Sequence, residues 1–250
     1  TAEFTLQRLA SARHDGAQPL VPLGGPLFTV VRGREGSTDA DFGGAAFKAA
    51  FDTSLGRLTS TTSRTEWRLS PYDNRLVLPP TLDSRIAQSQ RIWNEELRLA
   101  SETRAPVTWQ IGAWFSDSRT HGNIARGLVL PFAVIPIEAS TFQLDARTLA
   151  GFGEATFAPA AGWKITAGLR GEAVKKDFDR AQTVPGAGRF TAEKTFKALL
   201  PKLAVAYAFA PETNFSASVA QCTKPGGWSA YTANAALAHF RAENATTWEA

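Results

Sequence analysis

The chain is dominated by side chains that alternate, residue by residue, between apolar and polar. Residues 163–173 are the clearest case: one parity reads Trp, Ile, Ala, Leu, Gly, Ala, and the other reads Lys, Thr, Gly, Arg, Glu. Residues 107–115 and 202–209 follow a similar pattern, whereas residues 58–69 are rich in threonine and serine and leave the faces unassigned. Successive side chains of a β-strand point to opposite faces, so each alternating stretch places its charges on one face. The pattern predicts an all-β fold built from long strands.

Short and long connections alternate between these strands. Turn-forming residues mark short connections near residues 52–56, 101–106, 158–162 and 210–214, and long ones near 11–38, 71–84, 119–140, 181–188 and 224–239. An antiparallel up-and-down meander places its tight turns at one edge and its long loops at the other, as outer-membrane barrels do. No apolar run reaches the roughly 18 residues of a spanning helix. We therefore expect about ten strands of a transmembrane β-barrel.

Aromatic side chains gather beside the short connections. The residues concerned are Phe51, Trp109, Phe157, Trp163, Phe209 and Phe215. A girdle of aromatic residues marks the membrane interface of such barrels, and this is the interpretation we favour. The alternative is that these side chains close one end of a soluble β core.

Composition and motifs exclude several classes of function. The 250 residues include 27 basic and 23 acidic side chains, a net charge of +4 that is too small to indicate nucleic acid as a partner. The single cysteine and the widely separated His14, His121 and His239 fit no metal-ligand spacing. The chain has no Gly-x-Ser-x-Gly elbow, no P-loop and no dinucleotide fingerprint. We expect no catalytic residues, no cofactor, no metal site and no enzymatic activity.

A set of short strings resembles the barrel of TonB-dependent outer-membrane receptors. They are Phe-Gly-Glu-Ala-Thr-Phe at 152–157 with Ile-Thr-Ala-Gly-Leu-Arg at 165–170, Lys-Lys-Asp-Phe at 175–178, Leu-Pro-Lys-Leu at 200–203, Lys-Pro-Gly-Gly-Trp at 224–228, Glu-Leu-Arg-Leu-Ala at 96–100 and the strand at 243–249. Their order and spacing carry the resemblance from about residue 58 to residue 250. Cys222 and Thr223 depart from it, because the family usually has a glycine and an aromatic residue there.

The resemblance implies that residues 1–250 are a partial barrel domain of such a receptor. It implies a barrel of about 22 strands around a plugged lumen, whereas this chain shows no plug domain and no closing C-terminal strand. The expected function is TonB-dependent uptake of a scarce nutrient, such as a siderophore–iron complex, a cobalamin or a glycan, across the outer membrane of a Gram-negative bacterium. The expected partners are the nutrient, the plug, the TonB complex, and membrane lipid with lipopolysaccharide.

The alternation then assigns roles to particular side chains. A polar wall facing the lumen is predicted from Glu96, Arg98, Glu154, Lys164, Arg170, Glu172 and Lys202. The same charges facing lipid would cost about 2–4 kcal/mol at the midplane for Arg or Lys. The loop aromatics Phe132, Trp228 and Tyr231 are the candidates for ligand contact, because such side chains supply large contact areas. Lys175 and Lys176, placed at a strand end, are candidates for contact with lipopolysaccharide phosphates.

Two other classes of protein remain open at this point. A passive porin or an adhesin barrel would show the same periodicity, and only the strings above favour the receptor. A soluble β-sandwich that binds a ligand would use strands of about five or six residues, which the long alternating stretches oppose.

Overall fold

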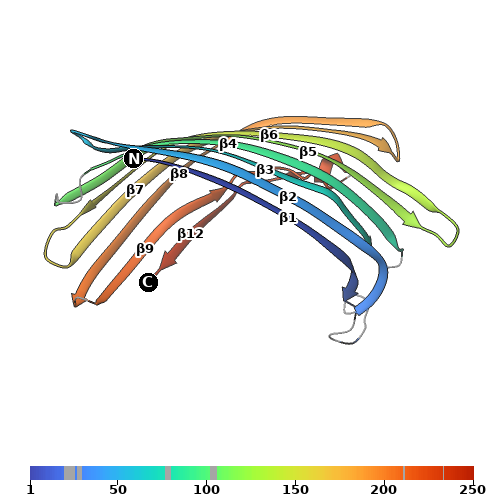
Figure 1. Cartoon of the computed structure of the whole chain (residues 1–250), viewed down its shortest axis with the longest axis horizontal. Coiled ribbons are helices and arrows are strands. Elements are labelled where there is room, and N and C mark those ends of the chain that lie inside the picture. The colour runs from blue at the N-terminus through green and yellow to red at the C-terminus, as the bar shows by residue number, and fades with distance from the viewer. Residues whose placement is uncertain (20–25, 27–29, 77–79, 102–105, 211, 233) are drawn as a thin grey trace.

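The structure is a computed structural model, and it describes the chain apart from residues 20–25, 27–29, 77–79, 102–105, 211 and 233. Within these residues one ten-stranded antiparallel sheet forms an arched wall (Figure 1). The strands follow one another in chain order: β1 (Ala2–Pro19), β2 (Val30–Thr53), β3 (Gly56–Leu76), β4 (Leu82–Ala100), β5 (Val107–Val129), β6 (Val134–Phe157), β7 (Trp163–Val184), β8 (Gly188–Ala210), β9 (Thr213–Lys224) and β12 (Glu243–Glu249). The predicted up-and-down meander is confirmed.

Most of the expected long connections are strands in the structure. β5 and β6 continue to residues 129 and 134, so the loop expected at 119–140 is a long hairpin with a short tip. β7 continues to residue 184 and β8 begins at 188, which likewise shortens the connection expected at 181–188. Only about 9–11 residues are needed to cross a bilayer, so strands of 19 to 24 residues (β2 to β8) extend beyond it. Turn-forming residues in these segments interrupt the alternation of apolar and polar side chains. Pairing with the neighbouring strands nevertheless keeps the segments extended.

The register of the strands separates two faces. Ile165 lies opposite Val205 and Ala167 opposite Leu203, whereas Gly168 lies opposite Lys202. We call the face that carries Leu169 and Leu203 the outer face, and the face that carries Arg170 and Lys202 the inner face.

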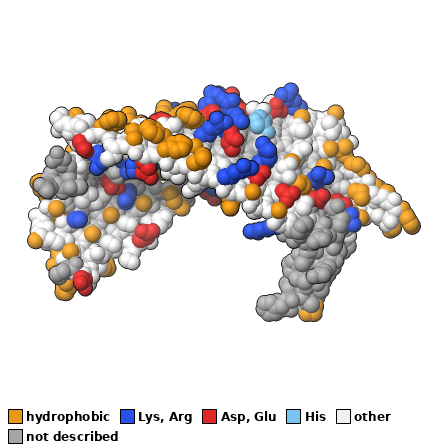
Figure 2. Space-filling model, in the orientation of Figure 1, with side chains coloured by type: hydrophobic (Ala, Val, Ile, Leu, Met, Phe, Trp, Pro, Cys, Tyr) orange, Lys and Arg blue, Asp and Glu red, His pale blue; other side chains and the backbone are white. Residues whose placement is uncertain are grey.

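The outer face is apolar over the half of the strands next to the short turns. Leu149, Leu169 and Leu203 are 63%, 48% and 49% exposed, in a sheet with no second layer over them. Figure 2 shows apolar side chains gathered over that half of the arch, with charged side chains nearer its middle. Monomeric soluble proteins rarely expose an apolar surface of this extent, so the face suits contact with lipid. Among the described residues, no helix is long and apolar enough to cross a membrane.

The segment after β9 is folded differently from the other connections. It contains β10 (Gly227–Trp228), which pairs with β11 (His239–Phe240), and a short 3₁₀ helix, η2 (Ala235–Leu237), capped by the Asn234 side chain. We call residues 225–242 the inner segment, because it packs against the inner face. The hydrophobic core of the chain lies at this contact.

Candidate functional site

All seven side chains predicted to line the lumen lie on the inner face. Glu96 and Arg98 pair at 2.6 Å, and Arg170 and Glu172 pair at 3.0 Å, each as neighbours two residues apart on one strand. Lys202 pairs with Glu154 at 3.0 Å across the intervening β7. The seventh, Lys164, lies beside the short turn before β7 and is exposed. That this face lines a pore stays a prediction.

Towards the long-hairpin end, the inner face carries an apolar cluster. Ile124, Phe142 and Phe178 are at most 6% exposed and pack with Trp228 and Ala230 of the inner segment. Gly122 permits this packing, since a Cβ atom there would lie 2.4 Å from the Phe142 ring. The Phe178 and Trp228 rings are stacked, with their centroids 6.1 Å apart. The cluster attaches the inner segment to β5, β6 and β7.

Polar contacts hold the inner segment at three further points. Lys176 Nζ donates to the Gly226 carbonyl at 2.9 Å, and Arg126 donates to the Tyr231 carbonyl at 3.1 Å. The Tyr231 hydroxyl donates to Gln88 of β4. Burial raises the pKa of Tyr231, which keeps that hydroxyl protonated as a donor at neutral pH.

Of the three aromatic residues predicted to contact ligand, Trp228 and Tyr231 both pack on the inner-face cluster, on Phe178 and Phe142, whereas Phe132 lies apart. Trp228 is 8% exposed because it packs on Phe178, whereas Tyr231 is 43% exposed. Phe132 lies at the tip between β5 and β6 and is fully exposed, so it packs on neither. Contact with ligand stays a prediction for all three.

A buried ion network beneath the inner segment was not anticipated from the sequence. Glu138 accepts from Arg126 at 2.6 Å and from Arg180 at 2.7 Å, and Glu138 and Arg180 are almost fully buried. Ser140 donates to Glu138, and Arg180 also donates to Gln182. Glu138 lies in the segment expected to be a loop. Carrying the alternation of β6 back from Phe142 would have placed it on the inner face, whereas a register shift breaks the alternation between Pro136 and Glu138.

The outer face carries charges immediately beyond its apolar band. The band ends at the level of Phe115, Leu149 and Ala173, which are paired across β5, β6 and β7. Beyond it, Glu66 bridges Arg64 and Arg91 and Asp117 bridges Arg119 and Arg147. Hydrogen bonds from Arg64 and Arg91 hold the pKa of Glu66 below its ordinary value. We call these four guanidiniums and two carboxylates the outer arginine row.

Lys175 and Lys176 do not act on the same surface. Lys175 lies on the outer face, where it pairs with Glu193 at 2.7 Å, while Lys176 lies on the inner face. The prediction that both meet lipopolysaccharide from a strand end is wrong in its geometry. They occupy the middle of β7, and adjacent residues of a strand project to opposite sides.

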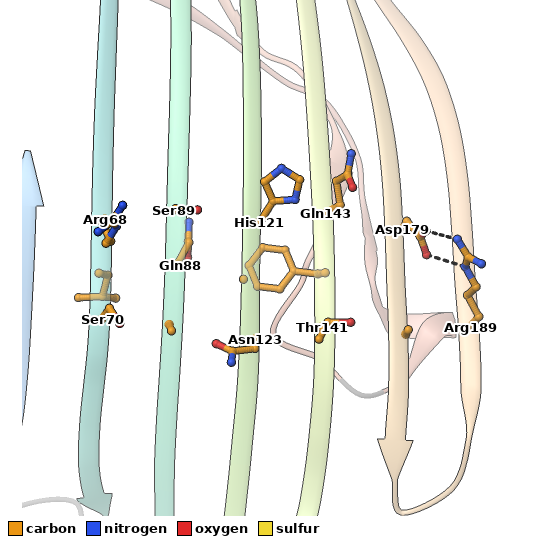
Figure 3. Close-up of a pocket in the computed structure, with 15 residues that line it drawn as sticks. Arg68, Ser70, Gln88, Ser89, His121, Asn123, Thr141, Gln143, Asp179 and Arg189 are labelled. Atoms are coloured by element: carbon orange, nitrogen blue, oxygen red, sulfur yellow. Dashed lines mark hydrogen bonds and ion pairs between the residues drawn. The ribbon is translucent and has the colours of Figure 1, made fainter. Parts of the chain in front are cut away.

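A shallow hollow of about 680 Å³ lies beside the outer arginine row. Figure 3 shows its polar lining, to which β5, β6, β7 and β8 contribute His121, Asn123, Thr141, Gln143, Asp179 and Arg189. Two hydrogen bonds join Arg189 to Asp179 and keep the pKa of that carboxyl below its ordinary value. Among the residues that the structure describes, no group of three or more His, Cys, Asp or Glu side chains could hold a metal ion.

Comparisons with solved structures show where this fold recurs. The ferric yersiniabactin uptake receptor FyuA from Yersinia pestis matches with a TM-score of 0.82 and 18% identity, over 99% of this chain and 39% of that one. The siderophore receptor PiuA from Acinetobacter baumannii matches with a TM-score of 0.70 and 13% identity, over 99% and 44%. The unliganded ferric citrate transporter FecA matches with a TM-score of 0.60 and 13% identity, over 88% of this chain and 33% of that one. The chain thus spans less than half the length of these proteins.

Comparison with curated proteins gives no significant match. The family model described as TonB dependent receptor-like, beta-barrel, matches residues 9–250. That match takes in all or part of each of the ten strands, and the same arrangement recurs in the receptors above. The chain belongs to the TonB-dependent receptor β-barrel family.

Proposed function

We propose that the chain is part of the barrel wall of an outer-membrane receptor that takes up a siderophore–iron complex with energy supplied through TonB. The observation that carries the proposal is the family match over residues 9–250. The sheet formed by these residues has one apolar face and one polar face. The printed names of the similar structures, receptors for ferric yersiniabactin and siderophores, support an iron chelate as the cargo. In this role the protein binds and transports its ligand without bond chemistry.

The rest of the receptor would complete the barrel and supply the plug. β1 and β12 lie at the two edges of the sheet and pair with no further strand among the described residues. Unpaired edge strands invite association, so additional strands at both edges would stabilise the wall. We assign the seven inner-face charges to the lumen wall, and Phe132, Trp228 and Tyr231 to the outer vestibule where ligand arrives.

Uptake by the full-length protein tests this function. Deleting its gene in a Gram-negative host and restoring it should abolish and then restore accumulation of a ⁵⁵Fe-labelled siderophore during iron starvation. Accumulation should fall to background when TonB is removed or a protonophore collapses the proton gradient. Uptake that survives both treatments would instead identify a passive pore. A gene-dependent response to cobalamin or maltodextrin alone would refute the iron chelate as cargo.

We also propose that the outer arginine row binds lipopolysaccharide phosphates. Arg91 and Arg119 lie directly opposite each other, and both are more than half exposed. Four guanidiniums form ion pairs with two carboxylates beside the apolar band, where lipid headgroups would lie, and Asp145 also lies opposite Arg119. The neighbouring hollow offers hydroxyl, amide and charged groups suited to the attached sugars.

Removing two of these guanidiniums should weaken the binding of lipopolysaccharide. Each basic residue near an anionic membrane surface contributes about 1 kcal/mol, so Arg91→Ala with Arg119→Ala should lower the affinity about tenfold or more. Native mass spectrometry of the full-length protein gives the lipopolysaccharide retained per molecule. Arg57→Ala, at the short-turn end, should retain the wild-type amount. Equal retention by the double variant and the wild type would contradict the assignment.

A further inference from the structure

Three lysine side chains converge on the inner face beside the inner segment. Lys176 of β7 and Lys194 of β8 are directly opposite each other, and Lys224 ends the next strand, β9. The Lys176 ammonium lies 5.9 Å from the centroids of both Phe196 and Phe240. Lys194 lies 5.3 Å from the Phe196 ring, and Lys224 lies 5.9 Å from the Phe240 ring. We call these five side chains the lysine cluster.

The positive charge of the lysine cluster is poorly compensated. Among the described residues, Glu243 is the only carboxylate that forms an ion pair with any of the three, at 3.5 Å from Lys224, and both partners are about two-thirds exposed. The nearby Asp177 and Glu193 lie opposite each other on the outer face. Burial and the charge of Lys224 lower the pKa of Lys176. Like charges directly opposite each other destabilise a sheet, so an anion between Lys176 and Lys194 would relieve their repulsion.

The surrounding backbone holds the lysine cluster in place. Gly226 leaves no room for a side chain, because a Cβ atom there would lie 2.7 Å from Phe196 and 2.8 Å from the Phe240 carbonyl oxygen. The hydrogen bond from Lys176 to Gly226 uses one of three ammonium donors and leaves two for a ligand. Two aromatic rings beside the ammonium groups lower the local polarity, which strengthens charge-assisted hydrogen bonds.

We propose that the lysine cluster is a subsite for the oxyanion part of the transported ligand, a group with two or more carboxylate, phenolate or phosphate oxygens. This inference rests on the proposed uptake function and narrows its cargo to anionic chelates. Lys176 and Lys194 each donate to one oxygen, and Lys224 reaches the ligand by exchanging its exposed contact with Glu243. The position on the inner face assigns the site to a soluble anion rather than to membrane lipid.

Binding of citrate and pyrophosphate to the full-length receptor in detergent tests the subsite. Calorimetric titration at constant ionic strength should show binding of both anions and none of glucose. Lys176→Gln with Lys194→Gln keeps the side chains polar but removes two charges, and each loss should weaken binding about tenfold. Lys194→Gln alone leaves the contact of Lys176 with Gly226 intact and should show one such step. Lys197→Gln, on the outer face of the same strand, should bind as wild type.

The outcomes separate this inference from the proposed function. Unchanged anion affinity in the double variant, or no anion binding by the wild type, would overturn the subsite even if TonB-dependent uptake is observed. Anion binding that is lost in the double variant supports the subsite, even if the uptake assay fails and overturns the proposed function. Vesicles with and without lipopolysaccharide distinguish the source of the anion. If the double variant loses lipopolysaccharide but not citrate, the site serves lipid and the inference is wrong.

Discussion

Replacing Glu138 with alanine should destabilise the full-length protein by about 3–5 kcal/mol, because it leaves two guanidiniums without their shared buried partner. Glu138 and Arg180 have side chains only 5% and 7% exposed, so water cannot replace the lost carboxylate. Arg180 Nε already lacks a partner among the described residues, so no acceptor beside this nitrogen can replace the Glu138 carboxylate. The free energy of unfolding in phospholipid vesicles, followed by tryptophan fluorescence in urea, measures the effect.

The matched control is Glu66→Ala in the outer arginine row. Glu66 also joins two arginines, but it is about half exposed, and exposed ion pairs contribute about 0–1 kcal/mol. Because Arg126 holds both Glu138 and the Tyr231 carbonyl, Glu138→Ala should also speed proteolysis within residues 225–242. A loss of stability no larger than that of Glu66→Ala would show that the buried network contributes little.

An arginine placed on the outer face should destabilise the wall far more than one placed on the inner face. Leu203→Arg would put a charge among Ala167 and Val219, within the apolar band, and should cost about 2–4 kcal/mol near the bilayer midplane. Ala204→Arg, one residue further on, projects to the inner face between Thr166 and Ser218. There it should change the free energy of unfolding in vesicles by less than about 1 kcal/mol.

This pair of variants tests the assignment of the two faces with little change in position along the strand. In detergent micelles, which adapt to a charged side chain more readily than a bilayer, the difference between the variants should shrink. Equal destabilisation by both variants in vesicles would contradict the assignment of lipid to the outer face. Greater destabilisation by Ala204→Arg would reverse it.

Alternation predicted the meander where the strands cross the apolar band. Residues 163–173 and 202–209 show it clearly because each parity there meets one environment along its whole length. Beyond the band the rule weakens, since both faces contain charges and apolar side chains: Phe178 points inward and Asp177 outward. Turn-forming residues in this less regular stretch are why the hairpin at 119–140 was expected to be a loop.

The functional surfaces followed from sequence only in part. The seven inner-face charges lie on one side because parity is a local property of a strand. Local pattern could not show that Lys175 and Lys176 serve different surfaces from the middle of β7, since their strand position was misjudged. It also could not show that Trp228 would be buried against Phe178, fifty residues earlier in the chain.

The amino-acid sequence alone thus specified the class of fold, the approximate number of strands and the opposite character of the two faces. Side-chain alternation is a property of each strand and does not depend on which distant residues it contacts. Three-dimensional pairing was needed to place Glu138 between Arg126 and Arg180, and Lys176 against Lys194. These contacts depend on the register of separate strands and on how residues 225–242 fold over them. A shift of one residue in a single strand would turn every such side chain to the other face.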